Sequence, residues 1–424
     1  MSWQTVPLCG ISKQKQITNC SNRELLSVYL GKGIVPFSSE SAKRTNVTSL
    51  DLSKYQAVDY GDFVLNNQQA WRGSVGVSKY KGIVSPAYIV LELSDDILTP
   101  YANYLFQSRT MVDQYVVCSK GVGDIQRNLY WDYLKRVSVP LPPREEQDQI
   151  VRYLDWKVSQ INKLINAKKR QIELLQEKRH AIIDKTITNS TGDKLRFCNI
   201  FKLSKGLSIT KADLKDEGIP CVSYGEVHSK YGFEVNPDVH KLRFVDESYL
   251  DSSPNSLLQY GDYVFADTSE DITGSGNFTY LNSNTRTFAG YHTIIARAVL
   301  PINHRYVAYF FDSSLYRTQI QKEVNGVKVY SITRSILNRT TINVPDIKTQ
   351  EQCVQDLDIQ CANIDKFIAI LQHELNLLPE YRTRLISDVV TGKLDVRDVV
   401  VPEYEATPDI SSDTDEESEE IVED

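Results

Sequence analysis

The sequence predicts an α+β protein in which two β-rich, mixed α/β domains alternate with two long helices. The helices are expected to pair as an antiparallel coiled coil with internal pseudo-twofold symmetry. Three observations predict this fold: a long stretch repeats after 203 positions, the repeated stretch has heptad spacing, and short β-type runs separated by turns precede each copy. The expected order is therefore domain, helix, domain, helix.

The repeat is clearest where DWKVSQINKLI at 155–165 returns as DIQCANIDKFI at 358–368. The correspondence runs without a gap from Pro142, which matches Pro345, to Thr188, which matches Thr391. Repetition over this length indicates a duplicated structural unit.

Apolar residues recur at the a and d positions of a heptad in both copies, which is typical of a coiled coil. The expected seam residues are Val151, Leu154, Ile161, Ile165, Ile172 and Leu175 in the first copy, and Val354, Leu357, Ile364, Ile368, Leu375 and Leu378 in the second. Arg179 and Arg382 interrupt both seams at the same place, and Lys168 is a further polar seam residue. A polar seam residue can fix the register, and a tolerated mismatch near a frayed end is the alternative. Pro379 predicts a kink or a local break in the second helix.

Proline-containing segments before each helix, and the change from β-type runs to heptads, give the expected boundaries. They are a first domain at 1–142, a helix at 143–190, a second domain at 191–345, a helix at 346–394 and an acidic tail at 395–424.

The net charge of −7 is concentrated at the C-terminus, because Glu403–Asp424 holds eleven acidic residues and no basic one. Without that stretch the rest of the chain carries +4. The tail is expected to be disordered, and one hypothesis is that it competes with nucleic acid for basic surfaces. A mildly basic body is compatible with a polyanionic partner, although ordinary charge scatter explains it equally well.

Other sequence features favour a cytoplasmic protein that does not contact a membrane. The seven cysteines are scattered and form no CxxC pair, which argues against a disulfide framework and a zinc site. The chain has no apolar run of the ~18 residues that a membrane helix needs, and its N-terminus lacks the apolar core of a signal peptide.

Catalytic motifs are missing, so we expect a non-catalytic chain without cofactor or metal. We find no phosphate-binding GxxxxGK[ST], no Asn-Pro-Pro-aromatic motif and no GxGxxG after a strand. The six histidines show no metal-ligand spacing. A stand-alone nuclease or methyltransferase is therefore disfavoured.

The chain resembles the specificity subunit of type I restriction–modification systems. The residues that carry the resemblance are LPPREEQ at 141–147 and VPDIKTQEQ at 344–352, the heptad helices that follow them, and Val390-Thr391-Gly392 at the end of the second copy. The resemblance implies two target-recognition domains that each read half of a bipartite, asymmetric double-stranded DNA target. It also implies that the helix pair docks two methyltransferase subunits, which use S-adenosylmethionine to methylate adenine, and that ATP-hydrolysing motor–nuclease subunits join. The alternative is a coiled-coil scaffold protein without DNA specificity.

Candidate DNA contacts follow from the rule that Arg and Lys pair with guanine, and Asn and Gln with adenine. In the first domain they lie in NNQQAWR and in the glycine-containing loop from Lys120: Asn66, Gln68, Gln69, Arg72, Lys120, Gln126 and Arg127. In the second domain they are Lys205, Lys211, Tyr224, Asn325, Lys328, Tyr330 and Arg334. The alternatives are a polar turn for the first stretch and core packing for the tyrosines.

Overall fold

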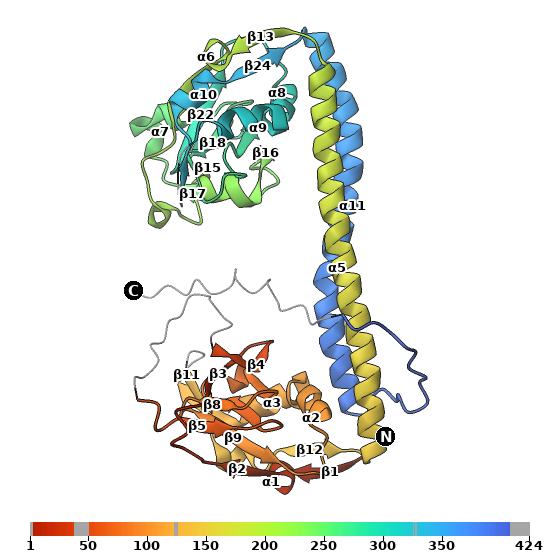
Figure 1. Cartoon of the computed structure of the whole chain (residues 1–424). Coiled ribbons are helices and arrows are strands. Elements are labelled where there is room, and N and C mark those ends of the chain that lie inside the picture. The colour runs from red at the N-terminus through yellow and green to blue at the C-terminus, as the bar shows by residue number, and fades with distance from the viewer. Residues whose placement is uncertain (1–2, 38–50, 123–125, 325, 327–328, 408–424) are drawn as a thin grey trace. The chain divides into compact units, whose positions relative to one another are not determined.

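The computed structural model describes residues 3–37, 51–122, 126–324, 326 and 329–407. The chain divides into two compact units, which we describe separately. Unit 1 comprises Met1–Arg170 and Gln372–Asp424, and unit 2 comprises Gln171–Leu371. The predicted α+β class is confirmed (Figure 1).

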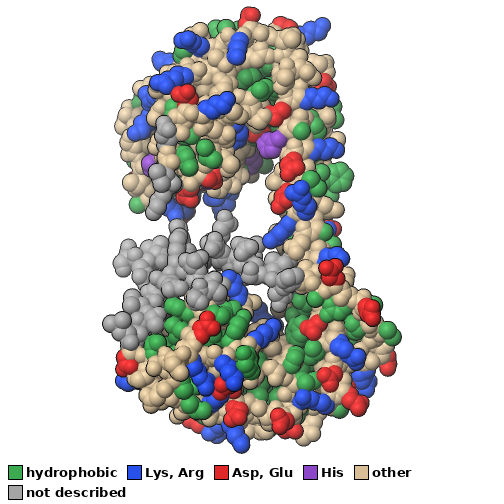
Figure 2. All heavy atoms as spheres, in the orientation of Figure 1, with side chains coloured by type: hydrophobic (Ala, Val, Ile, Leu, Met, Phe, Trp, Pro, Cys, Tyr) green, Lys and Arg blue, Asp and Glu red, His purple; other side chains and the backbone are tan. Residues whose placement is uncertain are grey.

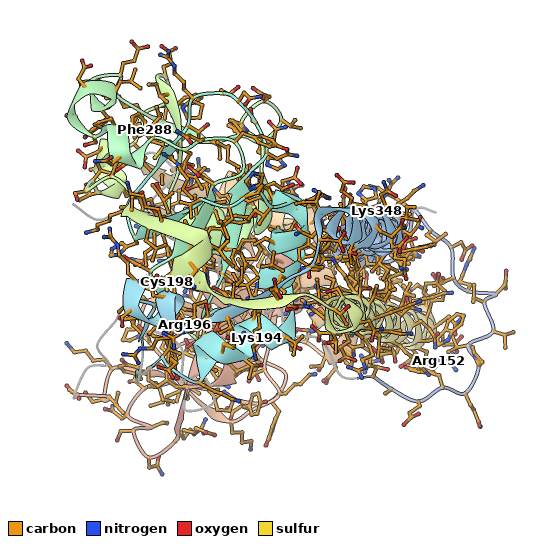
Figure 3. The ribbon with its side chains drawn as sticks, turned by 90° about the horizontal axis from the view of Figure 1, so that it is seen from above. Arg152, Lys194, Arg196, Cys198, Phe288 and Lys348 are labelled. Atoms are coloured by element: carbon orange, nitrogen blue, oxygen red, sulfur yellow. The ribbon has the colours of Figure 1, made fainter. Side chains whose placement is uncertain are left out.

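Two helices are far longer than the others: α5 (Arg144–Asn189) and α11 (Ile347–Val390). They lie side by side in Figures 1 and 3. Within unit 1, Lys168 Nζ lies 2.5 Å from Glu374 Oε2, and within unit 2, Arg179 Nε lies 3.2 Å from Asp365 Oδ1. Arg382 Nη1 also donates to Asn162 Oδ1 at 3.3 Å, so within unit 1 a later residue of α5 faces an earlier residue of α11 and the helices run antiparallel. The predicted coiled coil is confirmed.

All of the predicted seam residues are buried or partly buried, and Leu154 and Leu357 are 0% exposed. The side chain of Lys168 is 15% exposed. Its ion pair with Glu374 compensates its charge within the seam. The predicted break at Pro379 does not occur, since α11 continues through it. Leu375 and Leu378, which precede Pro379, pack against the core of unit 1 in the turn where one backbone hydrogen bond is lost.

Unit 1 holds two four-stranded sheets, ordered β2-β9-β6-β7 and β4-β3-β8-β5. The first is antiparallel throughout, whereas β3 and β8 of the second are parallel. Short ribbons β1-β12 and β10-β11 complete the domain. The elements are β1 (Gln4–Pro7), α1 (Leu8–Ile11), β2 (Ser12–Lys15), β3 (Glu24–Tyr29), β4 (Gly33–Pro36), β5 (Gln56–Val58), β6 (Phe63–Asn66), η2 (Ala70–Arg72), β7 (Val75–Val77), β8 (Gly82–Val84), β9 (Tyr88–Leu93), α2 (Thr99–Phe106), α3 (Arg109–Cys118), β10 (Ser119–Val122), β11 (Gln126–Leu129), α4 (Trp131–Leu134) and β12 (Ser138–Leu141).

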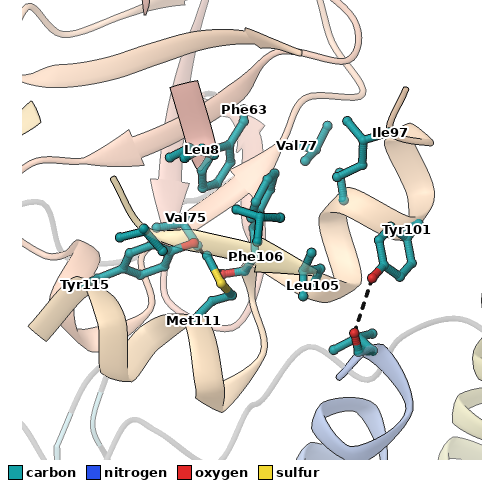
Figure 4. Packing of buried hydrophobic residues seen from close by; sticks show 14 of the residues in the cluster. Leu8, Phe63, Val75, Val77, Ile97, Tyr101, Leu105, Phe106, Met111 and Tyr115 are labelled. Carbon is teal, nitrogen blue, oxygen red and sulfur yellow. Dashed lines mark hydrogen bonds between the residues drawn. The ribbon is translucent and has the colours of Figure 1, made fainter. Parts of the chain in front are cut away.

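The main core of unit 1 lies between the antiparallel sheet and helices α2 and α3 (Figure 4). The rings of Phe63 and Phe106 stack with centroids 4.1 Å apart. Tyr101 is 0% exposed, and its hydroxyl donates to the carbonyl of Val390 at 3.2 Å. The β-rich domain is therefore fixed directly to the end of α11 within this unit.

Unit 2 holds a five-stranded sheet, β14-β22-β18-β20-β16, and a three-stranded sheet, β17-β15-β21. Its core is aromatic, with Phe311 contacting the rings of Phe197, Phe265 and Tyr316. Figure 3 shows Lys194 and Arg196 on β13, the strand that follows α5. The elements are β13 (Asp193–Arg196), α6 (Phe197–Ile200), β14 (Phe201–Lys205), η3 (Lys211–Asp213), β15 (Ile219–Val222), η4 (Glu226–Lys230), β16 (Phe233–Val235), β17 (Arg243–Val245), α7 (Tyr249–Ser252), η5 (Pro254–Ser256), β18 (Tyr263–Ala266), β19 (Thr268–Ser269), β20 (Phe278–Leu281), β21 (Phe288–Ala289), β22 (Thr293–Ala298), α8 (His304–Asp312), α9 (Ser314–Gln321), β23 (Tyr330–Ser331), α10 (Arg334–Arg339) and β24 (Thr341–Val344).

One buried glutamine ties each β-rich domain to the start of its long helix. Gln147 is 0% exposed; its Oε1 accepts from Leu98 N at 2.7 Å and its Nε2 donates to the carbonyl of Pro142 at 2.9 Å. Gln350 is 1% exposed and makes the matching bonds, from Asn303 N and to the carbonyl of Pro345. The repeated glutamine is thus an anchor in both copies.

A tyrosine–aspartate hydrogen bond repeats in the same way. Tyr104 on α2 donates to Asp155 Oδ1, and Tyr309 on α8 donates to Asp358 Oδ1, both at 2.7 Å. Helices α2 and α3 of unit 1 therefore correspond to α8 and α9 of unit 2, although the domains around them have diverged.

Beyond α11 the chain returns to α5 within unit 1. Gln149 Nε2 donates to the carbonyls of Val396 and Val399 at 2.9 and 2.7 Å, and Thr407 N donates to Ser159 Oγ at 2.8 Å. The predicted tail therefore begins along α5, and its most acidic part, from Pro408 onward, lies outside the described residues.

Candidate nucleic-acid interface

The two candidate stretches of the first domain meet at Trp71. The guanidinium carbon of Arg72 lies 4.8 Å from the ring centroid of Trp71, and that of Arg127 lies 5.3 Å from it. Cation–π contacts of this kind hold guanidinium planes in fixed positions. Leu129 N, on the same strand as Arg127, donates to the carbonyl of Asn67 at 3.1 Å. We call Trp71, Arg72 and Arg127 the Trp71 cluster.

The polar residues before Trp71 build the turn that carries it. Asn66 Oδ1 accepts from Gln68 N at 3.1 Å, and Trp71 Nε1 donates to the carbonyl of Gln68 at 2.9 Å. The side chain of Gln68 is exposed, and that of Gln69 is partly buried. Asn66 thus has a structural role in the turn, while the Gln68 amide points away from the core.

A second basic–aromatic pair lies on the neighbouring strand. Lys120 Nζ donates to Tyr133 Oη at 2.6 Å and lies 4.3 Å from the centre of the same ring. Tyr133 and Tyr130 are each 46% exposed, with their rings edge to face. Exposed aromatic rings beside cations are groups on which bases stack. The sequence analysis did not single out Trp71, Tyr130 or Tyr133 as individual contacts, although they directly neighbour predicted basic residues.

In the second domain the corresponding place is chemically different. Ile332 N donates to the carbonyl of Asp267 at 2.8 Å, as Leu129 N does to Asn67 in the first domain. Tyr330 stands opposite Ser269 in the β19–β23 ribbon and packs partly against the core. Arg334 is exposed at the start of α10, where Thr333 Oγ1 caps the helix by accepting from Ile336 N. A tyrosine and acidic residues therefore replace the guanidinium-rich surface of the first domain.

Tyr224 lies near the acidic loop that contains Asp267, Glu270 and Asp271. Its ring stacks on His228 with centroids 5.1 Å apart. Burial, together with the carboxylates of Glu270, Asp271 and Asp267, raises the pKa of the Tyr224 hydroxyl. The hydroxyl therefore stays protonated at neutral pH and remains a hydrogen-bond donor.

The other candidates lie apart or outside the described residues. Lys205 ends β14 and Lys211 opens η3, and both are exposed. Asn325 and Lys328 lie outside the described residues, as do Gly123–Ile125 of the first loop. Gln126 lies in β11, but its side chain is outside the described part of the chain.

On the face shown in Figure 2, Lys and Arg side chains are interspersed with Asp and Glu side chains. Among the described residues, no group of His, Cys, Asp and Glu could hold a metal ion. The same residues contain no helix long and apolar enough to cross a membrane. All seven cysteines are free thiols.

Known proteins resemble this chain in sequence. Residues 2–174 match the model of the type I restriction modification DNA specificity domain. The chain is also 22% identical over 398 residues to the type I restriction enzyme MjaVIII specificity subunit of Methanocaldococcus jannaschii, covering 87% of this chain and 88% of that one. The chain is thus similar to the specificity subunits of type I restriction enzymes.

Solved structures agree in fold. The HsdS subunit from Thermoanaerobacter tengcongensis is 15% identical with a TM-score of 0.51, and the likeness covers 92% of this chain and 97% of that one. A second chain comes from a structure described as "Structural basis underlying complex assembly and conformational transition of the type I R-M system". It is 14% identical with a TM-score of 0.65, over 92% and 98% of the two chains. The predicted resemblance to type I specificity subunits is thus confirmed.

Proposed function

We propose that this chain is the DNA-recognition subunit of a type I restriction–modification complex and is itself non-catalytic. The β-rich domains at 1–142 and 191–345 each read one half of a bipartite, asymmetric target. One observation carries the proposal: matching anchors, Gln147 and Gln350, hold two domains whose candidate DNA-reading surfaces differ in chemistry.

The first domain presents guanidinium and ammonium groups. Arginine can donate two hydrogen bonds to O6 and N7 of guanine in the major groove. Because Trp71 holds Arg72 and Arg127 from two separate segments, the cluster offers a preorganised donor pair. Lys120, beside Tyr133, extends the same surface toward a phosphate or a stacked base.

The second domain presents acceptors as well as donors. Asp267, Glu270 and Asp271 lie close enough to Tyr224 to raise its pKa, and carboxylates accept from the cytosine amino group. Tyr330 and Arg334 lie on the segment paired with this loop. Two half-sites of different sequence follow from these two unlike surfaces.

The helix pair docks two DNA methyltransferase subunits, and motor–nuclease subunits complete the complex. Apolar side chains remain exposed on α11 outside its seam, including Ile359 at 66% and Phe367 at 61% exposure. Such residues are typical of surfaces that a partner covers.

Methylome sequencing of host cells with and without this chain tests the proposal. We expect adenine methylation at one interrupted, asymmetric motif that disappears when the gene for this chain is deleted. An unchanged methylome, together with equal binding of the purified complex to all duplexes, would instead support the scaffold alternative.

A further inference from the structure

The two copies differ most where α8 and α9, or α2 and α3, meet the long helices. In unit 2 the carboxylate of Asp312 accepts from Arg179 Nη1 at 2.8 Å and lies 3.3 Å from Arg317 Nη2. Asp312 is 7% exposed and directly precedes Ser313, the N-cap of α9. Unit 2 therefore encloses one of its own anions between two guanidinium groups, next to the positive end of a helix.

The corresponding position in unit 1 holds a neutral side chain instead of the anion. Gln107 directly precedes Ser108, the N-cap of α3, just as Asp312 precedes the N-cap of α9. Gln107 is exposed, and its Nε2 donates to the carbonyl of Val75 at 3.2 Å. The amide thus turns toward β7 and leaves the position of the carboxylate open.

The arginine of the long helix is kept in both copies, but its second acidic neighbour is also replaced. Arg382 matches Arg179 in the repeat, and Asn162 matches Asp365. Arg179 Nε lies 3.2 Å from Asp365, whereas Arg382 Nη1 donates to Asn162 Oδ1 at 3.3 Å. The two positions that hold carboxylates in unit 2, Asp312 and Asp365, thus correspond to the amide residues Gln107 and Asn162 in unit 1.

A cavity of about 710 Å³ occupies this place in unit 1, and Gln107, Ser108, Arg109 and Arg382 line it. Ser108 is 2% exposed, and within the described part of the chain its hydroxyl has no hydrogen-bond partner. A buried hydroxyl without a partner costs about 1–3 kcal/mol unless a ligand satisfies it. The cavity also opens at the first turn of α3, a ten-residue helix whose first N–H groups have no partner within the helix.

We propose that this cavity binds a phosphate group, which takes the place that the Asp312 carboxylate fills in unit 2. The Ser108 hydroxyl and the first N–H groups of α3 donate to its oxygens. Arg382 and Arg109 balance its charge, and Arg109 Nε also lies 3.1 Å from Asp113 Oδ1. Asp155 also lines the cavity, but its Oδ1 already accepts from Tyr104 at 2.7 Å. The anion therefore binds on the arginine side.

Two sources supply a group of this chemistry: the DNA backbone and free phosphate. A backbone phosphate here would fix the first domain against the duplex without reading a base. A free phosphate would brace the contact between α3 and the helix pair.

The test compares three full-length proteins: wild type, Gln107→Asp and Gln107→Ala. The aspartate restores the internal anion of unit 2, whereas the alanine removes the same amide contacts without adding charge. Melting temperature is measured in inorganic phosphate against chloride of equal ionic strength. We expect phosphate to raise the melting temperature of wild type and Gln107→Ala and to leave Gln107→Asp unchanged. Ser108→Ala, which removes one donor to an anion, should weaken phosphate binding about tenfold.

A second arm measures the affinity of each protein, in complex with its methyltransferase partner, for random-sequence duplex across salt concentrations. If the DNA backbone is the source, Gln107→Asp lowers the slope of log affinity against log salt by about one. An unchanged slope with a lost thermal response assigns free phosphate.

Equal phosphate responses in all three proteins, loss in Gln107→Ala as well, or no effect in either arm would overturn the inference. Because inorganic phosphate needs no DNA, the first arm also separates this inference from the proposed recognition function.

Discussion

The anchoring glutamines give the sharpest test of how each recognition domain is held, through the substitutions Gln147→Leu and Gln350→Leu. Leucine keeps the volume but makes no hydrogen bonds. Gln350→Leu leaves the N–H of Asn303 and the carbonyl of Pro345 without their partner. An unsatisfied buried group costs about 1–3 kcal/mol, so the expected loss for these two groups is roughly 2–6 kcal/mol.

Gln147→Leu should cost somewhat more, because Gln147 Nε2 also donates to the carbonyl of Asp96 at 2.9 Å. Hydrogen exchange read by mass spectrometry resolves the effect by segment. Gln147→Leu should speed exchange in α2 and β12, and Gln350→Leu should speed it in α8 and β24. The control is Gln160→Leu at an exposed position of α5, which should change stability by less than about 0.5 kcal/mol. If both anchor variants behaved like this control, the glutamines would not hold the domains.

The remaining predictions concern recognition, ion pairs and spacing. Arg127→Ala should lose about 1–3 kcal/mol of binding at the first half-site and leave the second unchanged, measured by methylation of half-site variants with the exposed Arg339→Ala as control; equal loss at both half-sites would count against the assignment. Burial raises the pKa of Asp312, but the neighbouring guanidinium groups of Arg317 and Arg179 lower it further, so that its pKa lies below the ordinary value. Its stabilisation should therefore be complete above about pH 4, the pKa of an unfolded aspartate, and disappear as pH falls through the lower folded pKa. Asp312→Asn should remove this acid dependence and cost about 3–5 kcal/mol at neutral pH, because two partly buried guanidinium groups lose the carboxylate that they share. Urea unfolding across pH measures both. Inserting one helical turn within Gln160–Gln171 should change the gap between the half-sites and not the half-sites themselves, and a methylome with an unchanged gap would rule out the spacer model.

The helical half of the fold could be predicted from the sequence, because heptads are a local pattern that the partner helix satisfies along its whole length. The repeat located both helices and the glutamine that anchors each of them. Pro379 misled the prediction of a local break, since local propensity does not include the packing of Leu375 and Leu378 that keeps α11 continuous. The sheet order could not be predicted, because strands that pair across the domain carry no mutual signal in one sequence.

The candidate site was predicted in pieces that the sequence could not assemble. Arg72 and Arg127 were both named, but their common contact with Trp71 depends on the pairing of β11 with the turn after β6. Tertiary contacts also show how the two domains correspond. Backbone hydrogen bonds match Leu129 with Ile332, which aligns Arg127 with Tyr330 and not with Arg334. This pairing keeps the offset of 203 positions that relates Pro142 to Pro345, so the repeat extends back to it.

The anchors explain how the two domains could diverge without loss of the fold. Each domain contributes one tyrosine and a few backbone groups, while the long helix contributes Gln147 and Asp155, or Gln350 and Asp358. The constraint on a domain is therefore local to α2 or α8 and the adjoining strand. Residues outside these contacts, such as Trp71 and Arg127, can change with the target. It follows that a domain exchanged between copies should fold if it keeps the tyrosine of α2 or α8, whatever bases it reads.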